Sequence, residues 1–228
     1  MPNDHQARPL GLFLGLAIIL ASLPWGSAQA ASVFINEIHY DNAGADTGEA
    51  IEIAGPAGTN LTGWSVILYN GNGGAQYGTT SLMGTIADQQ NGFGTLSFNQ
   101  PGLQNGAPDG LALVDSGNSV IQFLSYEGFF TAVGGPADGL MSTDIGVAES
   151  SSTPIGHSLQ LIGMGTDSSD FTWASPMTDT FGAVNTGQTF TGGGQQPVPE
   201  PSTILLLGSG LTGISFWRWR SRILRPQS

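Results

Sequence analysis

Short apolar runs, many of them rich in β-branched and aromatic residues, alternate with turn-forming residues through the middle of the chain. Each run holds four to eight residues, which is the length of an ordinary β-strand. No longer stretch shows an apolar stripe with the period of a capped helix. The pattern predicts strands at Val33–Tyr40, Ala50–Ala54, Trp64–Tyr69, Thr79–Ile86, Phe93–Phe98, Leu111–Val114, Val120–Tyr126 and His157–Ile162, with a ninth at Asp170–Trp173.

Glycine, asparagine and proline separate these runs, as in Asn70-Gly71-Asn72-Gly73-Gly74 and Asn91-Gly92. The clearest hairpin joins Leu111–Val114 to Val120–Leu124 through Ser116-Gly117-Asn118. Many short strands without intervening helices indicate an all-β fold, and a β-sandwich rather than an α/β sheet.

The two ends do not belong to this pattern. Residues 1–30 have the features of a secretory signal peptide, with an apolar run at Leu10–Leu23 forming a signal helix. Ala28 and Ala30 fit the A-x-A cleavage rule, which makes Ala31 the first residue after export through the Sec machinery. The alternative is a permanent anchor, which the short apolar run and the small residues disfavour.

The folded domain is expected at residues 31–191, followed by a Gly/Gln/Pro linker at 192–198. Residues 199–228 begin with Pro199, Glu200 and Pro201 and continue into an apolar stretch at 203–217. That stretch predicts a short transmembrane helix, and the basic tail behind it stays in the cytoplasm by the positive-inside rule. The tail contains Arg218, Arg220, Arg222 and Arg225.

This C-terminal order of motif, apolar stretch and arginine-rich tail resembles the PEP-CTERM sorting signal. The resemblance implies recognition by an exosortase-type enzyme and cleavage near Pro199–Pro201. It also implies transient anchoring in the inner membrane of a Gram-negative bacterium that makes exopolysaccharide. Delivery to the cell surface or extracellular matrix would follow.

Charge is divided sharply between the ends and the middle of the chain. All five basic residues lie in the terminal segments, whereas fifteen of the 17 Asp and Glu residues lie between Glu37 and Asp179. A domain without Lys or Arg lacks the cations that neutralise phosphates, so nucleic acid is excluded as a partner. The chain also has no cysteine, which excludes disulfides and thiolate chemistry.

The order of several short motifs resembles the lamin-tail domain of bacterial secreted proteins. The most specific are Ile35-Asn36-Glu37-Ile38 and Leu61-Thr62-Gly63-Trp64, with Asp109–Val114 and His157–Leu161 further along. The resemblance covers about residues 32–190 and implies an immunoglobulin-like β-sandwich. In bacteria such domains accompany secreted nucleases or phosphatases, which suggests an accessory role for a separately encoded enzyme.

Four carboxylates fall within twelve residues, at Asp41, Asp46, Glu49 and Glu52. Calcium binds six to eight oxygen ligands, so this loop is a candidate Ca²⁺ site, although its spacing is not that of an EF-hand. The alternative is a solvated acidic turn. No other cofactor is indicated.

Catalytic arrangements find little support. Glu37 and Glu52 lie on neighbouring predicted strands and offer the carboxyl pair of a glycosidase. The resemblance to the lamin-tail domain implies instead that both are structural and accept hydrogen bonds from backbone or hydroxyl groups. His39 and His157 have no spacing that indicates a metal or a triad. Gly208 to Gly213 matches G-x-G-x-x-G only formally, because it lies inside the C-terminal apolar stretch.

The aromatic residues have two possible roles: they fill the core of the sandwich, or they form a surface on which sugars stack. Trp64 is expected in the core of the sandwich, and Tyr69 and Tyr77, which flank the Gly-rich loop, are the better surface candidates. The favoured function is a non-enzymatic surface or matrix protein that acts by adhesion or polymer interaction with exopolysaccharide or a surface protein. A Ca²⁺-dependent polysaccharide-binding module and the accessory domain are the alternatives.

Overall fold

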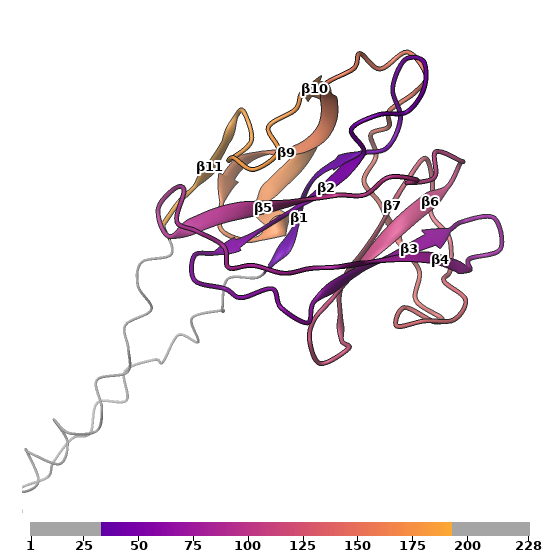
Figure 1. Cartoon of the computed structure of the whole chain (residues 1–228), viewed down its shortest axis with the longest axis horizontal. Helices are drawn as coiled ribbons and strands as arrows, with labels where there is room; N and C mark the ends of the chain where they lie inside the picture. The colour runs from indigo at the N-terminus through magenta and orange to yellow at the C-terminus, as the bar shows by residue number, and fades with distance from the viewer. Residues whose placement is uncertain (1–32, 193–228) are drawn as a thin grey trace, which may run out of the picture.

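The computed structural model describes residues 33–192, which form two stacked β-sheets (Figure 1). The first sheet has the order β10-β9-β1-β2-β5, with β11 pairing to β9. The second has the order β4-β3-β6-β7-β8. One 3-10 turn at Ser168–Asp170 is the only helical element among these residues, so the all-β prediction is confirmed.

The strands of the first sheet are β1 (Phe34–His39), β2 (Ala50–Pro56), β5 (Phe93–Asn99), β9 (His157–Gly165), β10 (Phe171–Thr178) and β11 (Gln188–Phe190). Those of the second sheet are β3 (Ser65–Asn70), β4 (Gln76–Ser81), β6 (Asp109–Val114), β7 (Val120–Tyr126) and β8 (Thr143–Asp144).

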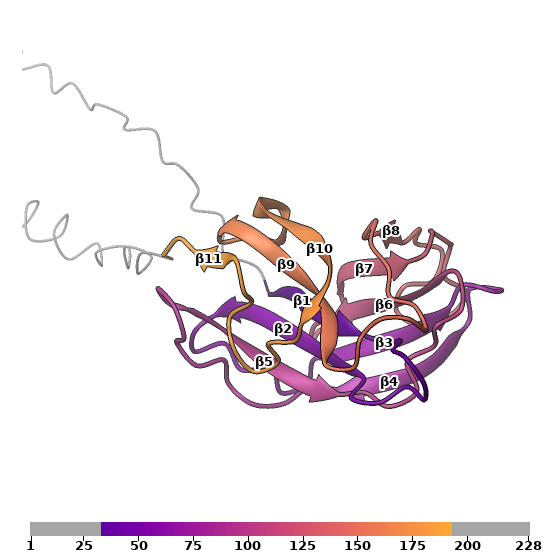
Figure 2. The same cartoon turned by 90° about the horizontal axis from the view of Figure 1, so that it is seen from above.

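The main apolar core lies between the two sheets. Figure 2 shows the two sheets from a second direction. Side chains alternate along β3, so Val66 and Leu68 join this core while Ile67 and Tyr69 face the other side of the sheet. That second side is also buried, because the chain from 127 to 142 lies over it and inserts Phe130. Strands β3 and β6 therefore have two buried faces, which explains why they contain nearly continuous apolar runs.

A β-bulge in β1 lets Ile35 and Ile38 point to the same face of the sheet. Ile35 and Ile38 both belong to the core between the sheets, although residues three apart on a regular strand point to opposite faces. The register with β2 shifts between Ile35 and Glu37, which makes Asn36 the extra residue. The bulge brings Glu37 to the outer face of the sheet, where the polar network described below begins.

The last described strand closes the outer face of the first sheet. The ring of Phe190 stacks on Phe93 with centroids 5.0 Å apart and meets the edge of Phe171 at 5.7 Å. Phe190 is fully buried. Residues 33–192 thus contain their own core, three apolar clusters and all of the strand pairing above, which are the features of a domain that folds independently.

Several predicted boundaries are wrong. Strand β4 lies at Gln76–Ser81 rather than 79–86, because pairing with β3 selects this polar stretch, and Leu82 and Ile86 insert into the core from a loop. Strand β10 continues to Thr178 along β9 instead of ending at Trp173. The sequence pattern does not predict the short strands β8 and β11, because each consists of only two or three residues and is defined by parallel pairing with an earlier strand. The predicted hairpin between β6 and β7 is confirmed.

Candidate functional site

A buried polar network lies on the outer face of the first sheet, under the chain from 180 to 188. Glu52 is at its centre and is fully buried. Asn36 Nδ2 donates to Glu52 Oε1 at 2.9 Å, and the backbone N–H of Gly182 donates to Glu52 Oε2 at 2.6 Å. Asn185 Nδ2 donates to the carbonyl oxygen of Asn36 at 3.0 Å. The network therefore holds the C-terminal part of the domain against β1 and β2.

Glu37 extends the same network. Its carboxylate accepts hydrogen bonds from the hydroxyl of Ser158 and from the backbone and hydroxyl of Thr180. Burial raises the pKa of Glu37, and burial together with the charge of Glu37 raises the pKa of Glu52 to about 8. Both carboxyl groups are enclosed by protein and accept hydrogen bonds from it. The carboxyl pair of a glycosidase must instead be open to the substrate.

A second buried network surrounds Glu149. Its Oε1 lies 2.9 Å from Nδ1 of His39, and its Oε2 accepts the backbone N–H groups of Tyr40 at 2.6 Å and Asp41 at 3.0 Å. Burial opposes a charged imidazole, but the hydrogen bond and charge of Glu149 outweigh it and raise the pKa of His39. His157 has a different environment: it lies at the surface, with Nδ1 3.2 Å from the carbonyl oxygen of Pro154.

The structure brings two of the four candidate Ca²⁺ ligands together. The carboxyl groups of Asp41 and Asp46 lie within hydrogen-bonding reach of each other, and burial followed by the charge of Asp46 raises the pKa of Asp41. Asn105 Nδ2 donates to Asp46 Oδ2 at 3.2 Å.

The other two candidates lie apart from this pair. Glu49 accepts the backbone N–H of Gly102 at 2.7 Å, and Glu52 belongs to the buried network on the outer face. Within residues 33–192, no three His, Cys, Asp or Glu side chains gather closely enough to hold a metal ion. The four carboxylates that are close in sequence therefore do not form one cluster, because the strand pairing of β2 turns Glu52 away from the loop.

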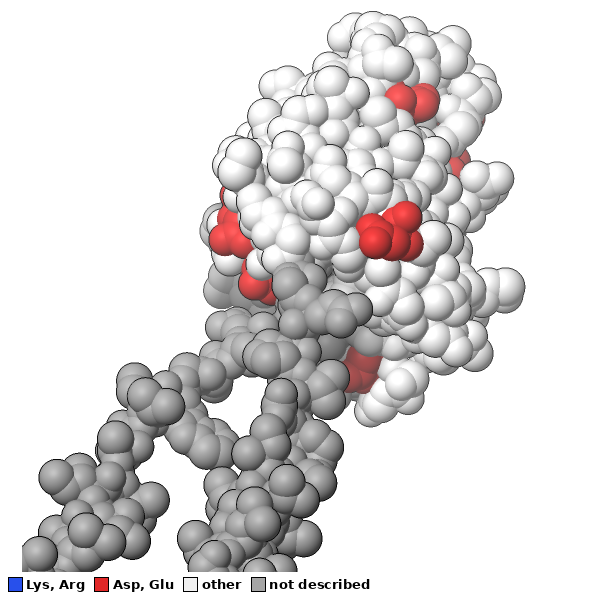
Figure 3. All heavy atoms as spheres, turned by 90° about the vertical axis from the view of Figure 1, so that its left-hand side faces the viewer, with Lys and Arg blue, Asp and Glu red and all other residues white. Residues whose placement is uncertain are grey.

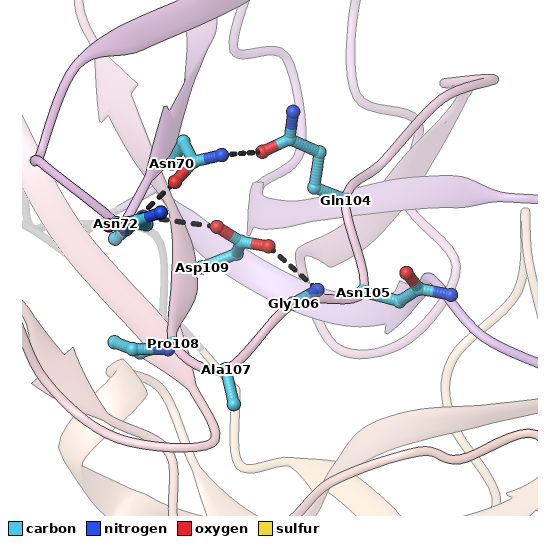
Figure 4. Close-up of a pocket in the computed structure, with 9 residues that line it drawn as sticks. Asn70, Asn72, Gln104, Asn105, Gly106, Ala107, Pro108 and Asp109 are labelled. Carbon is cyan, nitrogen blue, oxygen red and sulfur yellow. Dashed lines mark hydrogen bonds between the residues drawn. The ribbon is translucent and has the colours of Figure 1, made fainter.

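A polar hollow of about 600 Å³ opens between the β3–β4 loop and the β5–β6 loop (Figure 4). Asp109 supports its floor: the carboxylate accepts the backbone N–H of Gly71 at 3.0 Å and of Gly106 at 2.9 Å. Burial raises the pKa of Asp109. The hollow is lined by Asn70, Gly71, Asn72, Gln104, Asn105, Gly106, Ala107, Pro108 and Asp109.

Tyrosine side chains fix the wall of this hollow from behind. The hydroxyl of Tyr77 accepts the backbone N–H of Gln104 at 3.0 Å, and that of Tyr126 donates to the carbonyl oxygen of the same residue. Burial raises the pKa of Tyr77 to about 12. Asn70 Nδ2 donates to Gln104 Oε1 at 2.6 Å and so joins the two loops. The sequence pattern does not predict this hollow, because its lining residues are ordinary turn residues. Only the packing of the two loops brings them together.

Most aromatic candidates are core residues. Tyr69 is fully buried, so the expectation of a surface position is wrong. Its hydroxyl donates to the carbonyl oxygen of Gly134 and accepts the N–H of Ala137, which ties down the chain over β3. Tyr77 is half-buried, and both it and Trp64 pack against the core between the sheets. Trp64 thus contacts the core as expected, but its side chain is only partly buried.

The hollow and the ends of the described chain lie at opposite ends of the domain. Figures 1 and 2 show the β3–β4 loop at one end of the sandwich, and the start of β1 together with β11 at the other. The described chain ends at Gly192, close to the Pro-Glu-Pro motif at 199–201. The hollow therefore lies at the end of the domain away from the point where the described chain leads towards the sorting signal.

The domain surface carries only one sign of fixed charge. Figure 3 shows scattered carboxylates on the face that bears the two chain ends, and no Lys or Arg among the described residues in view. The sequence between Arg8 and Arg218 contains no Lys or Arg. Anionic polymers are consequently repelled unless cations lie between them and the protein.

Comparison with known families gives one result. Residues 197–222 match the PEP-CTERM protein-sorting motif, which includes Pro199, Glu200 and Pro201 and three of the four tail arginines. The chain therefore carries a signal for export, for membrane anchoring before processing, and for exosortase-type sorting towards the cell surface. No curated protein and no solved structure matches the chain.

Three predictions concern segments outside the described residues. They are the signal peptide with its cleavage at Ala28, Ala30 and Ala31, the linker at 192–198 beyond Gly192, and the transmembrane stretch at 203–217. Among residues 33–192, no helix is long and apolar enough to cross a membrane.

Proposed function

We propose that this protein is a non-enzymatic binding module that acts at the cell surface or in the extracellular matrix by adhesion or polymer interaction. The observation that carries the proposal is the polar hollow at the end of the sandwich opposite Gly192, where the described chain ends. A binding site at that end is remote from the point at which the described chain leads towards the sorting segment. The sorting signal at 197–222 directs the protein towards the cell surface.

The state of the buried carboxyl groups supports a binding role over a catalytic one. Glu37, Glu52 and Glu149 are fully or almost fully buried, and their oxygens accept hydrogen bonds from the protein itself. A general acid or base must reach a proton of the substrate. These three groups instead hold loop segments against β1 and β2, which is a structural use.

Co-sedimentation with matrix polysaccharide from the producing cells tests the proposal. Residues 31–196 would be mixed with that polysaccharide in Ca²⁺ and in EDTA, and the pelleted protein measured. Binding under either condition is expected. If the protein stays in the supernatant under both, polymer interaction is refuted, and the search for a function moves to protein partners.

A Ca²⁺-dependent mode of polysaccharide binding is the second candidate. The contact between the Asp41 and Asp46 carboxyl groups supports it, because a divalent cation would relieve their repulsion where the domain has no Lys or Arg. Millimolar Ca²⁺ should then raise the melting temperature of the domain, and Asp46→Asn should abolish the rise. Asp88→Asn, which removes an exposed carboxylate elsewhere, is the control. An unchanged melting temperature would end this candidate.

We also infer that the domain is a lamin-tail-like, immunoglobulin-like sandwich. Three of the four resembling motifs fall on strands in the expected order: Ile35–Ile38 on β1, Asp109–Val114 on β6 and His157–Leu161 on β9. The fourth, Leu61–Trp64, forms the turn that leads into β3. An experimental structure of residues 31–196 that differs in strand order from lamin-tail domains would overturn this assignment.

A further inference from the structure

The chemistry of the hollow suggests which kind of polymer it binds. Side-chain amides dominate its lining, and three of them have hydrogen-bonding atoms without a partner among the described residues. These are Nε2 of Gln104, Oδ1 of Asn105 and the whole carboxamide of Asn72. Carboxamides donate and accept hydrogen bonds through fixed planar groups, which suits ligands that carry many hydroxyl groups.

Asp109 is the charged residue of the hollow, and the protein itself already uses its carboxylate oxygens as hydrogen-bond acceptors. Asp109 is buried, and its two oxygens each accept one backbone N–H across the floor. The remaining lining residues are uncharged. The hollow therefore offers neutral hydrogen-bonding groups and no cation for a carboxylate or sulfate of a ligand.

An exposed aromatic residue follows, in the chain, a glycine that lies next to the hollow. Gly128 lies against Pro108 of the hollow, since a Cβ built on Gly128 would be 3.4 Å from Cβ of Pro108. The next residue is Phe129, whose side chain is 67% exposed, while Phe130 turns inward to the buried cluster on β3 and β7. An exposed aromatic ring offers a flat apolar surface on which a ligand can pack.

Amides and an aromatic ring together match the two kinds of group that a sugar presents, hydroxyl groups and apolar C–H groups. Hydroxyl groups around a pyranose ring hydrogen-bond to carboxamides, and its C–H groups pack on the face of an aromatic ring. Anionic sugars fit poorly, because fifteen carboxylates and no Lys or Arg lie between Glu37 and Asp179.

We propose that the hollow between the β3–β4 and β5–β6 loops, with Phe129 at its rim, binds an uncharged, hydroxyl-rich polysaccharide without the help of a metal ion. This inference rests on the proposed polymer interaction and goes further by naming the site and the class of polymer. Phe129 provides the stacking surface, and Asn72 and Gln104 provide the hydrogen bonds.

The test separates the matrix polysaccharide of the producing cells into neutral and acidic fractions by anion exchange. Binding of residues 31–196 to each fraction is measured in EDTA and in Ca²⁺, for the wild type and for Phe129→Ala, Phe129→Trp and Asn72→Ala. Met83→Ala is the matched control, because Met83 is also 67% exposed and follows the opposite end of β4. Cooperative thermal unfolding of each variant verifies its fold.

We expect binding to the neutral fraction, weakened roughly tenfold by Phe129→Ala and by Asn72→Ala, which corresponds to about 1.4 kcal/mol. Phe129→Trp should keep or strengthen binding, and Met83→Ala should leave it unchanged. Binding that resists both hollow variants, or that needs the acidic fraction with Ca²⁺, overturns this inference and leaves the proposed function standing. Binding to neither fraction, with or without Ca²⁺, overturns both.

Discussion

Glu37 and Glu52 lie opposite each other in register on β1 and β2, and the chain from 180 to 188 closes over both carboxyl groups. Two acids in one buried network, without any Lys or Arg to balance them, favour protonation of one member of the pair. The pair therefore connects the stability of the domain to pH at the point where the chain leads into the sorting segment.

Glu52→Gln should make the stability of the domain less sensitive to pH. The pKa of Glu52 rises from 4.5 to about 8 on folding, so the folded state keeps a proton that the unfolded state releases. The contribution is complete below pH 4.5 and falls as pH rises to about 8, by at most about 1.4 kcal/mol per pH unit. Melting temperatures between pH 5 and 9 should decline less steeply for the variant. Glu49→Gln controls for the lost charge, and equal slopes for wild type and Glu52→Gln would refute the prediction.

Glu149→Ala should destabilise the domain by about 3 kcal/mol or more, because it leaves the buried N–H groups of Tyr40 and Asp41 and the ring of His39 without their acceptor. Urea unfolding measured by circular dichroism gives this free energy. Asp88→Ala removes an exposed carboxylate that caps one backbone N–H and should cost less than about 1 kcal/mol. Similar losses for the two variants would contradict the role of Glu149.

Phe190→Ala should cost about 3–5 kcal/mol, because a fully buried ring stacked on Phe93 is replaced by a cavity. Phe129→Ala, at an exposed phenylalanine, should change the free energy of unfolding by less than about 0.5 kcal/mol. Thermal and urea unfolding of both variants test the contrast. A Phe190→Ala domain as stable as the wild type would show that β11 is dispensable.

Gly71→Ala should disturb the hollow and weaken the domain by about 1–3 kcal/mol. A Cβ at this position would lie 2.1 Å from the carbonyl oxygen of Pro108, which cannot move without shifting the backbone of the β5–β6 loop. Gly117→Ala is the control, since Gly117 lies in the β6–β7 hairpin outside the hollow and its Cβ would meet only the Asp115 carboxylate at 3.3 Å. Unfolding free energies and polysaccharide binding should both fall for Gly71→Ala, and unchanged values would refute the close approach of the two loops.

The sequence by itself determined the class of the fold and the arrangement of the chain. Strand lengths, turn residues and the lack of a helical stripe are local properties, so the all-β architecture and the β6–β7 hairpin followed from them. The sorting signal is a contiguous motif, which is why Pro199, Glu200 and Pro201 identified it without a structure.

Only the tertiary structure decided which distant residues meet. Glu52 is close to Asp46 in sequence, yet the pairing of β2 turns it into a network with Gly182, while Asn105 from another loop reaches Asp46. Tyr69 looked like a surface residue until the 127–142 segment covered it. The hollow likewise exists only where two loops approach. Such contacts depend on the register and packing of the whole sandwich, which no local pattern encodes.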